Sequence, residues 1–221
     1  MKTVEIFSGS ESFSKVAKSL GHETWTTDIN KSFNPDYVGD VLDYETQIVI
    51  FEQVKKAKVV WMSPVCTTWS LASGNTHWNE FRQPKTDKAN IAISMMMFCR
   101  FIADYCIKNN KIFFIENPNG RAVWILDNQY LKRCWYCQYG DTRAKPTNIW
   151  TNLNWTPKTC FNNNPNCNHE RAKRGSKTGT QGLKGNYDRS RIPEKLFYEI
   201  FNILDKGQTK LESKQREQVQ K

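Results

Sequence analysis

The stretch TVEIFSGSESFSKVAKSL, residues 3–20, has the pattern of a strand, a tight turn and a helix. Residues 3–7 form a short apolar run that ends at the turn Ser8-Gly9-Ser10. Residues 11–20 then place apolar side chains on one helical face, at Phe13, Val16, Ala17 and Leu20, and Gly21 fits a helix stop. The stretch therefore predicts a strand whose carboxyl end leads directly into a helix N-terminus.

The same alternation continues along the first 117 residues. Further strands are predicted over residues 23–29, 36–42, 57–62 and 111–117, with helices around residues 48–54 and over residues 87–108. Strands that alternate with helices are typical of right-handed β-α-β units around a mainly parallel sheet with helices on both faces. The long helix is expected to bury a stripe made of Ile91, Met95, Phe98, Ile102 and Tyr105, together with Cys99 and Cys106. We therefore expect an α/β, Rossmann-like fold.

The pattern changes after Trp150, where Asn, Gly, Lys and Pro replace most apolar residues. We expect residues 1–151 to form the main domain and residues 152–190 a small loop-rich insert. Residues 191–204 regain helical periodicity and should complete the main domain, and residues 205–221 should be a flexible tail.

Positive charge is in excess and is concentrated in the insert. Lys and Arg exceed Asp and Glu by 32 − 22 = 10 over the 221 residues. Residues 158–191 contain eight Lys or Arg and two acidic residues, which gives this segment a net charge of +6. Fixed positive charge of this kind favours a polyanionic partner such as a nucleic acid.

The composition is that of a globular chain, with 38% hydrophobic and 24% charged residues. No stretch is expected to supply the roughly 20 apolar residues that span a bilayer, and the first ten residues lack an apolar signal region. We expect a cytoplasmic protein that does not bind membranes and is a monomer. Its seven cysteines should then be reduced, so each is a core residue, a metal ligand or a nucleophile.

Polar residues follow the strands where an open parallel sheet binds its ligands. Gly9 and Ser10 open the first helix, and Asp28 ends the second strand, 28 − 9 = 19 residues after Gly9. This is the usual place for a carboxylate that accepts hydrogen bonds from ribose hydroxyls. Asp40 follows the third strand and could accept from an adenine amino group. Each residue alone also fits an ordinary turn, but together they favour a nucleoside-bearing cofactor.

The fourth and fifth strands end in SPVCTTWS (63–70) and ENPNG (116–120). Cys66 alone could be a spacer, a ligand or a nucleophile. Glu116 ends an apolar strand, where desolvation raises a carboxyl pKa and favours proton donation. A thiol and an acid on neighbouring strand ends suit substitution at carbon 5 of cytosine. There a thiolate attacks carbon 6 while the acid protonates N3, and carbon 5 then takes a methyl group.

With these residues assembled, the chain resembles the DNA cytosine-C5 methyltransferases, and is most similar to compact phage-type members. FSGSESFSKVA resembles the family's Phe-x-Gly-x-Gly motif, SPVC its Pro-Cys motif, ENPN its Glu-Asn motif, and YCQYGDTRAKPTNIWTN (136–152) its Gln-x-Arg-x-Arg motif. The likeness covers residues 3–204 and implies the fold of S-adenosylmethionine (SAM)-dependent methyltransferases. It also implies DNA methylation from SAM in a phage or bacterial setting, on a flipped or single-stranded cytosine.

The resemblance implies a role for individual residues. Catalytic roles fall on Cys66 as nucleophile, Glu116 as proton donor, Asn117 as its support and Arg143 as the contact to the cytosine carbonyl. Binding of SAM falls on Phe7, Ser8, Gly9, Ser10, Asp28, Ile29, Asp40, Val41 and Pro64. The insert corresponds to the target-recognition region, with DNA contacts expected from Lys173, Arg174, Lys177, Lys184 and Arg189.

Three positions depart from the family pattern. Glu11 stands where a second glycine is usual, so its carboxylate could oppose the carboxylate of SAM. Val65 replaces the proline that precedes the nucleophile, and Lys145 stands in place of a second arginine. The recognition region is also short, so few bases are read or another chain contributes.

Three soft ligands lie close together in the insert, at Cys160, Cys167 and His169. With one cysteine from the pair Cys134 and Cys137 they could hold a structural zinc. Cys137 is expected to be the fourth ligand if Cys134 points into the core. Unligated thiols are the alternative, and the spacing does not decide between them.

Other functions remain open at this point. Transfer to an exocyclic amino group would keep the fold, although those enzymes carry an aromatic residue where this chain has Cys66. A catalytically silent DNA-binding protein of the same fold is a second alternative, supported by Glu11 and Val65. An RNA substrate is a third, because the charge pattern does not distinguish the two nucleic acids.

Overall fold

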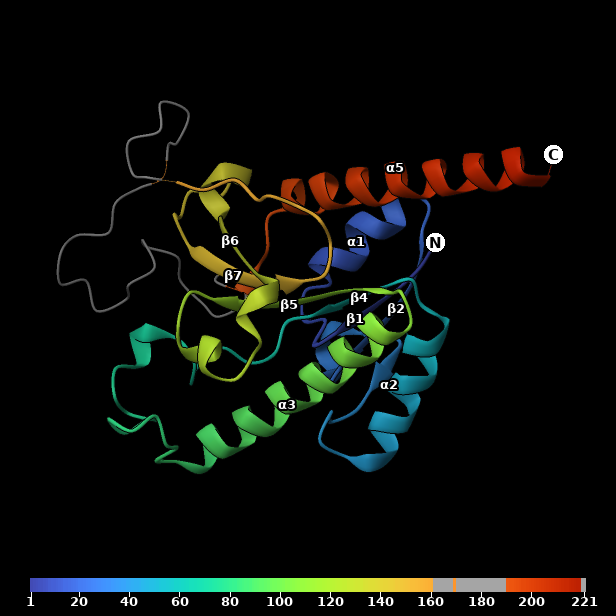
Figure 1. Ribbon diagram of the computed structural model, residues 1–221. Coiled ribbons are helices and arrows are strands. Elements are labelled where there is room, and N and C mark those ends of the chain that lie inside the picture. The colour runs from blue at the N-terminus through green and yellow to red at the C-terminus, as the bar shows by residue number, and fades with distance from the viewer. Residues whose placement is uncertain (161–168, 170–189, 220–221) are drawn as a thin grey trace.

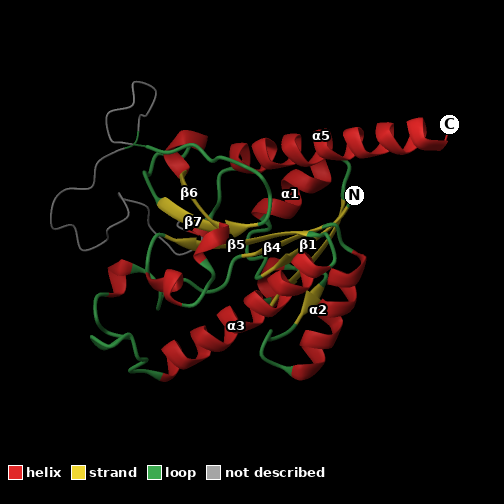
Figure 2. Cartoon of the chain, in the orientation of Figure 1, coloured by secondary structure: helices red, strands yellow, loops and turns green. Residues whose placement is uncertain are grey.

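The computed structural model describes residues 1–160, 169 and 190–219, whose strands form one sheet. These strands are β1 (Lys2–Ile6), β2 (Glu23–Asp28), β3 (Tyr37–Val38), β4 (Val59–Met62), β5 (Ile112–Pro118), β6 (Leu131–Trp135) and β7 (Pro146–Thr151). Within the described residues the sheet has seven strands in the order β3-β2-β1-β4-β5-β7-β6. Strands β1 to β5 run parallel, and β7 is antiparallel to its neighbours β5 and β6 (Figure 2).

Helices cover both faces of the sheet. The long ones are α1 (Ser12–Ser19), α2 (Tyr44–Lys56), α3 (Asp87–Lys108) and α5 (Glu194–Val219). Figure 1 shows α1 and α5 on one face and α2 and α3 on the other. The expected Rossmann-like α/β fold, with a mainly parallel sheet and helices on both faces, is therefore confirmed.

Each face has its own hydrophobic core. Under α1 and α5, the Phe13 ring stacks on Trp61 at 5.5 Å between centroids and on Phe201 at 5.2 Å. Under α2 and α3, buried residues of the sheet such as Val60 and Phe113 join the same cluster as Ile102 of α3. The two clusters alternate along β4, because successive side chains of a strand point to opposite faces.

Short 3-10 helices connect several of these elements. They are η1 (Lys31–Phe33), η2 (Leu71–Ser73), η3 (Arg121–Trp124), η4 (Asn128–Tyr130) and η5 (Tyr136–Tyr139). Three of them, η2, η3 and η5, come after β4, β5 and β6 respectively, and the ends of β4 and β5 are where catalytic residues were expected.

Some boundaries differ from the sequence prediction. The third strand was predicted over residues 36–42 but contains only Tyr37–Val38, because Gly39 and Asp40 turn the chain toward α2. The last helix was predicted to end at residue 204 and runs to Val219. Strands β6 and β7 were not predicted. The proposed division into domain, insert and tail stays a prediction.

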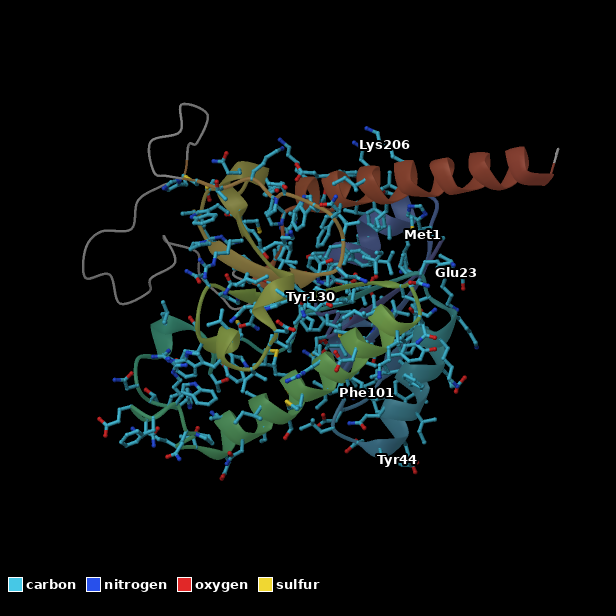
Figure 3. The ribbon with its side chains drawn as sticks, viewed as in Figure 1. Met1, Glu23, Tyr44, Phe101, Tyr130 and Lys206 are labelled. Carbon is cyan, nitrogen blue, oxygen red and sulfur yellow. The ribbon has the colours of Figure 1, made fainter. Side chains whose placement is uncertain are left out.

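Helix α3 matches its predicted bounds and buries part of the predicted stripe. Phe98 and Ile102 are buried, as are Cys99 and Cys106, so these predictions are confirmed, whereas Ile91 is exposed and the prediction for it is wrong. The other two members of the stripe, Met95 and Tyr105, are half-buried. By length and composition α3 could also cross a membrane, contrary to the expectation that no stretch could. A core helix of a soluble protein passes the same test, and α3 packs one side on β5 while Phe101 stays exposed (Figure 3).

Candidate active site

The carboxyl ends of β1, β2, β4 and β5 face the same edge of the sheet, because these strands are parallel. Two loops meet at this edge, one after β1 and one after β4. Backbone hydrogen bonds fix the start of each loop. The Ser8 amide donates to the Thr27 carbonyl at 3.0 Å, and the Ser63 amide donates to the Ile6 carbonyl at 3.2 Å. Residues distant in the sequence are thereby brought into one site.

The predicted cofactor loop after β1 is tied to Asp28. The Gly9 amide donates to Asp28 Oδ2 at 2.9 Å, and the Asn30 amide donates to Asp28 Oδ1 at 2.9 Å. Gly9 has a φ of +46°, a conformation that glycine adopts without strain. The carboxylate predicted to bind a ribose thus also shapes the glycine turn, and each oxygen keeps a lone pair for a hydroxyl group.

The remaining predicted cofactor residues differ in how far they are buried. Ser8 is buried, and its hydroxyl has no hydrogen-bond partner among the described residues. Asp40 accepts from the Leu42 amide at 2.9 Å, and the Gly39 amide donates to the Asp28 carbonyl at 3.2 Å, so the two carboxylates sit on linked turns. Val41 and Pro64 are buried, whereas Ile29 is 65% exposed. The orphan hydroxyl, the glycine turn and the carboxylates fit a polar nucleoside ligand.

Glu11 does not hold its carboxylate toward the glycine turn. Its side chain lies by Lys18, at 3.6 Å from Nζ, and accepts a hydrogen bond from the Thr26 hydroxyl at 3.4 Å. Its backbone has φ 54° and ψ 40°, which is the left-handed conformation. A glycine would adopt this conformation more easily, so the backbone at this position is of the kind that favours glycine.

Cys66 lies in a tight turn just after β4. Its carbonyl accepts from the amides of Trp69 at 3.1 Å and Ser70 at 2.9 Å, and the side chain is half-buried. Burial raises the pKa of the Cys66 thiol, the carboxylate of Glu116 raises it further, and the ammonium of Lys145 lowers it. The structure therefore brings Cys66, Glu116 and Lys145 within electrostatic range of one another. The neighbouring Val65 side chain is exposed.

Glu116 is only 7% exposed near the end of β5. Burial raises the pKa of its carboxyl group, while Lys145 and a hydrogen bond from Tyr136 oppose the rise. The Tyr136 hydroxyl donates to Glu116 Oε1 at 2.8 Å. Glu116 is thus a buried acid held in a fixed orientation, and Tyr136 is a site residue that the sequence analysis did not identify.

Asn117 connects β5 with the cysteine loop. Its Nδ2 donates to the Pro64 carbonyl at 3.1 Å, and its buried Oδ1 has no partner among the described residues. Asn148, paired with it across β5 and β7, is also buried, and both its amide atoms lack a partner within the same residues. Buried unsatisfied amides are rare in a folded protein, and here they lie beside the predicted nucleophile loop.

Gly120 holds the loop after β5 against the cysteine loop. A Cβ at this position would lie 2.4 Å from the carbonyl oxygen of Trp69. The neighbouring Arg121 donates its amide to that same carbonyl at 2.8 Å and its guanidinium to the Ser70 carbonyl at 3.0 Å. Only a residue without a side chain lets the two strand-end loops approach this closely.

Lys145, not Arg143, is the cation that acts on the thiol and the acid. Lys145 Nζ lies 4.7 Å from the centroid of the Tyr136 ring. Burial lowers the pKa of Lys145, and the charge of Glu116 raises it. Arg143 is buried and forms an ion pair with Asp141, and its guanidinium also donates to the Arg191 carbonyl at 3.5 Å. The predicted contact of Arg143 with a base stays a prediction.

Three of the four expected metal ligands come together. The ligand atoms of Cys137, Cys160 and His169 all lie within 4.8 Å of one another, a group that could hold a metal ion. Cys134 is instead fully buried in the core under α5, as expected if Cys137 is the ligand. Cys167 lies outside the described residues, as do the predicted DNA contacts Lys173, Arg174, Lys177, Lys184 and Arg189.

No protein-family model matches this chain, and no curated protein matches it. Among solved structures it is similar to the Entamoeba histolytica methyltransferase EhMeth, with a TM-score of 0.48, 18% identity, and coverage of 78% of this chain and 57% of that one. It is also similar to the Dnmt2 methyltransferase of S. pombe, with a TM-score of 0.41, 14% identity, and coverage of 73% and 52%. The chain therefore spans about half the length of these structures.

Proposed function

We propose that this protein transfers a methyl group from SAM to carbon 5 of cytosine in DNA. The observation that carries the proposal is the pairing of Cys66 and Glu116 at adjacent strand ends, with Lys145 acting on both. The reaction needs a nucleophile at carbon 6 and an acid at N3 on the same ring, and neither group suffices alone.

Cys66 would attack carbon 6 as a thiolate. Its burial and the Glu116 charge favour the neutral thiol, and Lys145 opposes them by stabilising the negative charge of the thiolate. The thiolate forms a bond to carbon 6 while N3 takes a proton, so carbon 5 becomes an enamine nucleophile. After methyl transfer, carbon 5 loses its proton, N3 returns its own, and the carbon–sulfur bond breaks to release Cys66.

Glu116 would supply the proton to N3. Its burial raises the carboxyl pKa, which is the direction that favours the protonated acid, and Tyr136 fixes the direction of one oxygen. Lys145 lies beside the same carboxyl group and is the residue we assign to the developing negative charge at the cytosine carbonyl. This assignment replaces Arg143, whose charge is already engaged by Asp141.

The cofactor would lie against the glycine turn, with its ribose on Asp28 and its adenine near Asp40. SAM supplies the electrophilic methyl group. The buried hydroxyl of Ser8, which has no partner among the described residues, and the free lone pairs of Asp28 are the groups that would satisfy its polar atoms. The Glu11 carboxylate does not oppose this placement, since it is held by Lys18 and Thr26.

The substrate base must reach Cys66 and Glu116 outside a duplex. Glu116 is buried and Cys66 half-buried, so a stacked base pair could not approach both groups. A cytosine that is flipped out or already single-stranded could do so. The excess of positive charge, densest between residues 158 and 191, supports DNA as the polymer that carries it.

The direct test is to incubate the protein with cytosine-containing DNA and labelled SAM, and to identify the modified nucleosides by mass spectrometry. We expect 5-methylcytosine, abolished by Cys66→Ala. N4-methylcytosine or N6-methyladenine would establish exocyclic transfer instead. An unmodified DNA, combined with no rise in melting temperature on adding SAM, would indicate a silent DNA-binding protein.

A further inference from the structure

Cys137, Cys160 and His169 form a cluster that the proposed methyl transfer does not use. Cys137 lies in η5, Cys160 follows the end of β7 by nine residues (160 − 151 = 9), and His169 comes from within the insert. Both cysteines are buried, and His169 is half-buried. Three separate segments of the chain thus contribute to one small site.

The spacing of the ligand atoms suits a single metal ion. Cys160 Sγ lies 3.7 Å from His169 Nδ1, and the Cys137 sulfur is within 4.8 Å of both. A sulfur and a nitrogen bound to one tetrahedral zinc, at bond lengths of about 2.3 and 2.0 Å, lie about 3.6 Å apart. The observed spacing agrees with this value before any adjustment of the side chains.

The donor set selects zinc over other common ions. Two thiolates and an imidazole are soft to borderline ligands, which hard cations such as Mg²⁺ and Ca²⁺ do not prefer. Zinc binds this combination in tetrahedral sites that hold small, loop-rich segments together. The residues around Cys160 supply little core of their own, which is the situation in which a metal stabilises a fold most.

We propose that Cys137, Cys160 and His169 bind a structural zinc ion that anchors the start of the basic insert to η5. Hydrogen bonds already join these parts of the chain. The Trp135 amide donates to the Lys158 carbonyl at 3.2 Å, and the Lys158 amide donates to the Tyr139 hydroxyl at 2.9 Å. The zinc extends this connection to Cys160 and to His169.

The position of the zinc links the insert to the reacting groups. Cys137 directly follows Tyr136, whose hydroxyl holds Glu116, so the metal-bearing turn is the one that orients the acid. The Cys66 and Glu116 pair already provides the covalent chemistry, and we assign the zinc no role in bond making. Zinc binding itself does not depend on the proposed reaction and can be tested apart from it.

The test is the zinc content of the 221-residue chain, purified without chelators and measured by plasma mass spectrometry. We expect one zinc per chain, lost in Cys160→Ser and in His169→Ala. The matched control is Cys66→Ala, which removes a half-buried cysteine outside the cluster and should retain the zinc while losing methyl transfer. A wild-type protein with substoichiometric zinc that fails to take up added zinc would overturn the proposal.

Two measurements on the wild-type protein cover the case in which the ligand variants fail to fold. Removal of zinc with a chelator should lower the melting temperature, and added zinc should restore it. Replacement with Co²⁺ should give the intense near-ultraviolet charge-transfer absorption of thiolate ligands. A melting temperature that is insensitive to both chelator and zinc, or Co²⁺ absorption without a thiolate band, would contradict the site.

Discussion

Lys145 is a cation that acts electrostatically on both Cys66 and Glu116. It lowers the pKa of Cys66 and that of Glu116, and its own position over the Tyr136 ring is fixed. A single cation can therefore stabilise the thiolate before attack and the oxyanion of the substrate afterwards. A lysine ammonium acts as a compact point charge, unlike the planar fork of an arginine.

The first prediction concerns Lys145→Met. Removal of the ammonium should raise the pKa of Cys66, because Lys145 is the nearby positive charge that stabilises the thiolate. The pH profile for alkylation of Cys66 by iodoacetamide, followed by peptide mass spectrometry, should move to higher pH, and methylation should fall by about 10²-fold. Lys56→Met, at an exposed position of α2, is the control. An unchanged alkylation profile would remove Lys145 from the site.

A second prediction concerns the left-handed backbone of Glu11. Gly and Ala remove the same side-chain contacts to Lys18 and Thr26, but only Gly adopts φ 54° without strain. Glu11→Gly should therefore be more stable than Glu11→Ala by about 1 kcal/mol, as measured by chemical denaturation. Equal stability of the two variants would show that the turn is not held in this conformation.

Among the elements, α1 depends on a buried carboxyl group of the neighbouring strand. Glu5 of β1 accepts from the amides of Ser14 at 2.9 Å and Phe13 at 3.3 Å, so it caps the helix N-terminus from outside the helix. Burial raises the pKa of Glu5 to about 7, and the nearby Glu11 adds to the rise. The helix that follows the predicted cofactor turn is thus tied to a group that titrates near neutrality.

The third prediction is that Glu5 makes the stability pH-dependent. Between pH 4.5 and about 7 the folded state keeps a proton that the unfolded chain has released, so the free energy of unfolding falls as pH rises through this window. A shift of this size corresponds to about 3 kcal/mol. Chemical denaturation of the wild type and of Glu5→Gln at several pH values measures the difference between their free energies of unfolding. A difference that stays constant from pH 4.5 to 8 would refute the assignment.

The fourth prediction concerns the contact between the loops after β4 and β5. Gly120→Ala places a Cβ 2.4 Å from the Trp69 carbonyl oxygen, so the Cys66 loop must shift. We expect a loss of about 1–3 kcal/mol in stability and a slower alkylation of Cys66. Gly207→Ala in α5, where no atom lies within 4 Å, should instead be neutral or stabilising. Equal stability and equal alkylation rates for the two variants would show that the backbone of Gly120 does not lie this close to the Trp69 carbonyl.

The sequence predicted well those elements whose patterns are local. The bounds of α3 agree at both ends, because Thr86 caps its start through a hydrogen bond to the Ala89 amide and its apolar spacing is continuous. Strands β6 and β7 were missed, because Lys132 and Arg133 interrupt the first and Pro146 begins the second. Their pairing with β5 comes from tertiary contacts, which no local pattern contains.

At the scale of the whole molecule, the sheet explains why part of the site could be predicted. Asp28 ends β2, Glu116 lies near the end of β5 and Cys66 follows β4. These strands are parallel, so strand order alone brings the three residues to one edge. The ion pair of Arg143 with Asp141, and the position of Lys145 near Cys66 and Glu116, could not be predicted, because they depend on how the loop after η5 folds. Tyr136 was missed for the same reason, because its contact to Glu116 crosses from η5 to β5.

The cluster of Cys137, Cys160 and His169 shows the same division. Its cysteine and histidine ligands were visible in the sequence, and Cys137 was expected in place of Cys134 if Cys134 faces the core, as it does. The distances between the ligand atoms required the fold, because η5 and the residues after β7 approach each other only when β6 and β7 pair.

The most direct test of the central claim is covalent trapping on DNA that contains 5-fluorocytosine, in the presence of SAM. Fluorine at carbon 5 blocks the final elimination, so the protein should remain bound to the DNA through Cys66 and migrate as a complex in a denaturing gel. The complex should require SAM and be absent in Cys66→Ala. A wild-type protein that methylates cytosine at carbon 5 without forming this complex, or a complex that survives Cys66→Ala, would contradict the account.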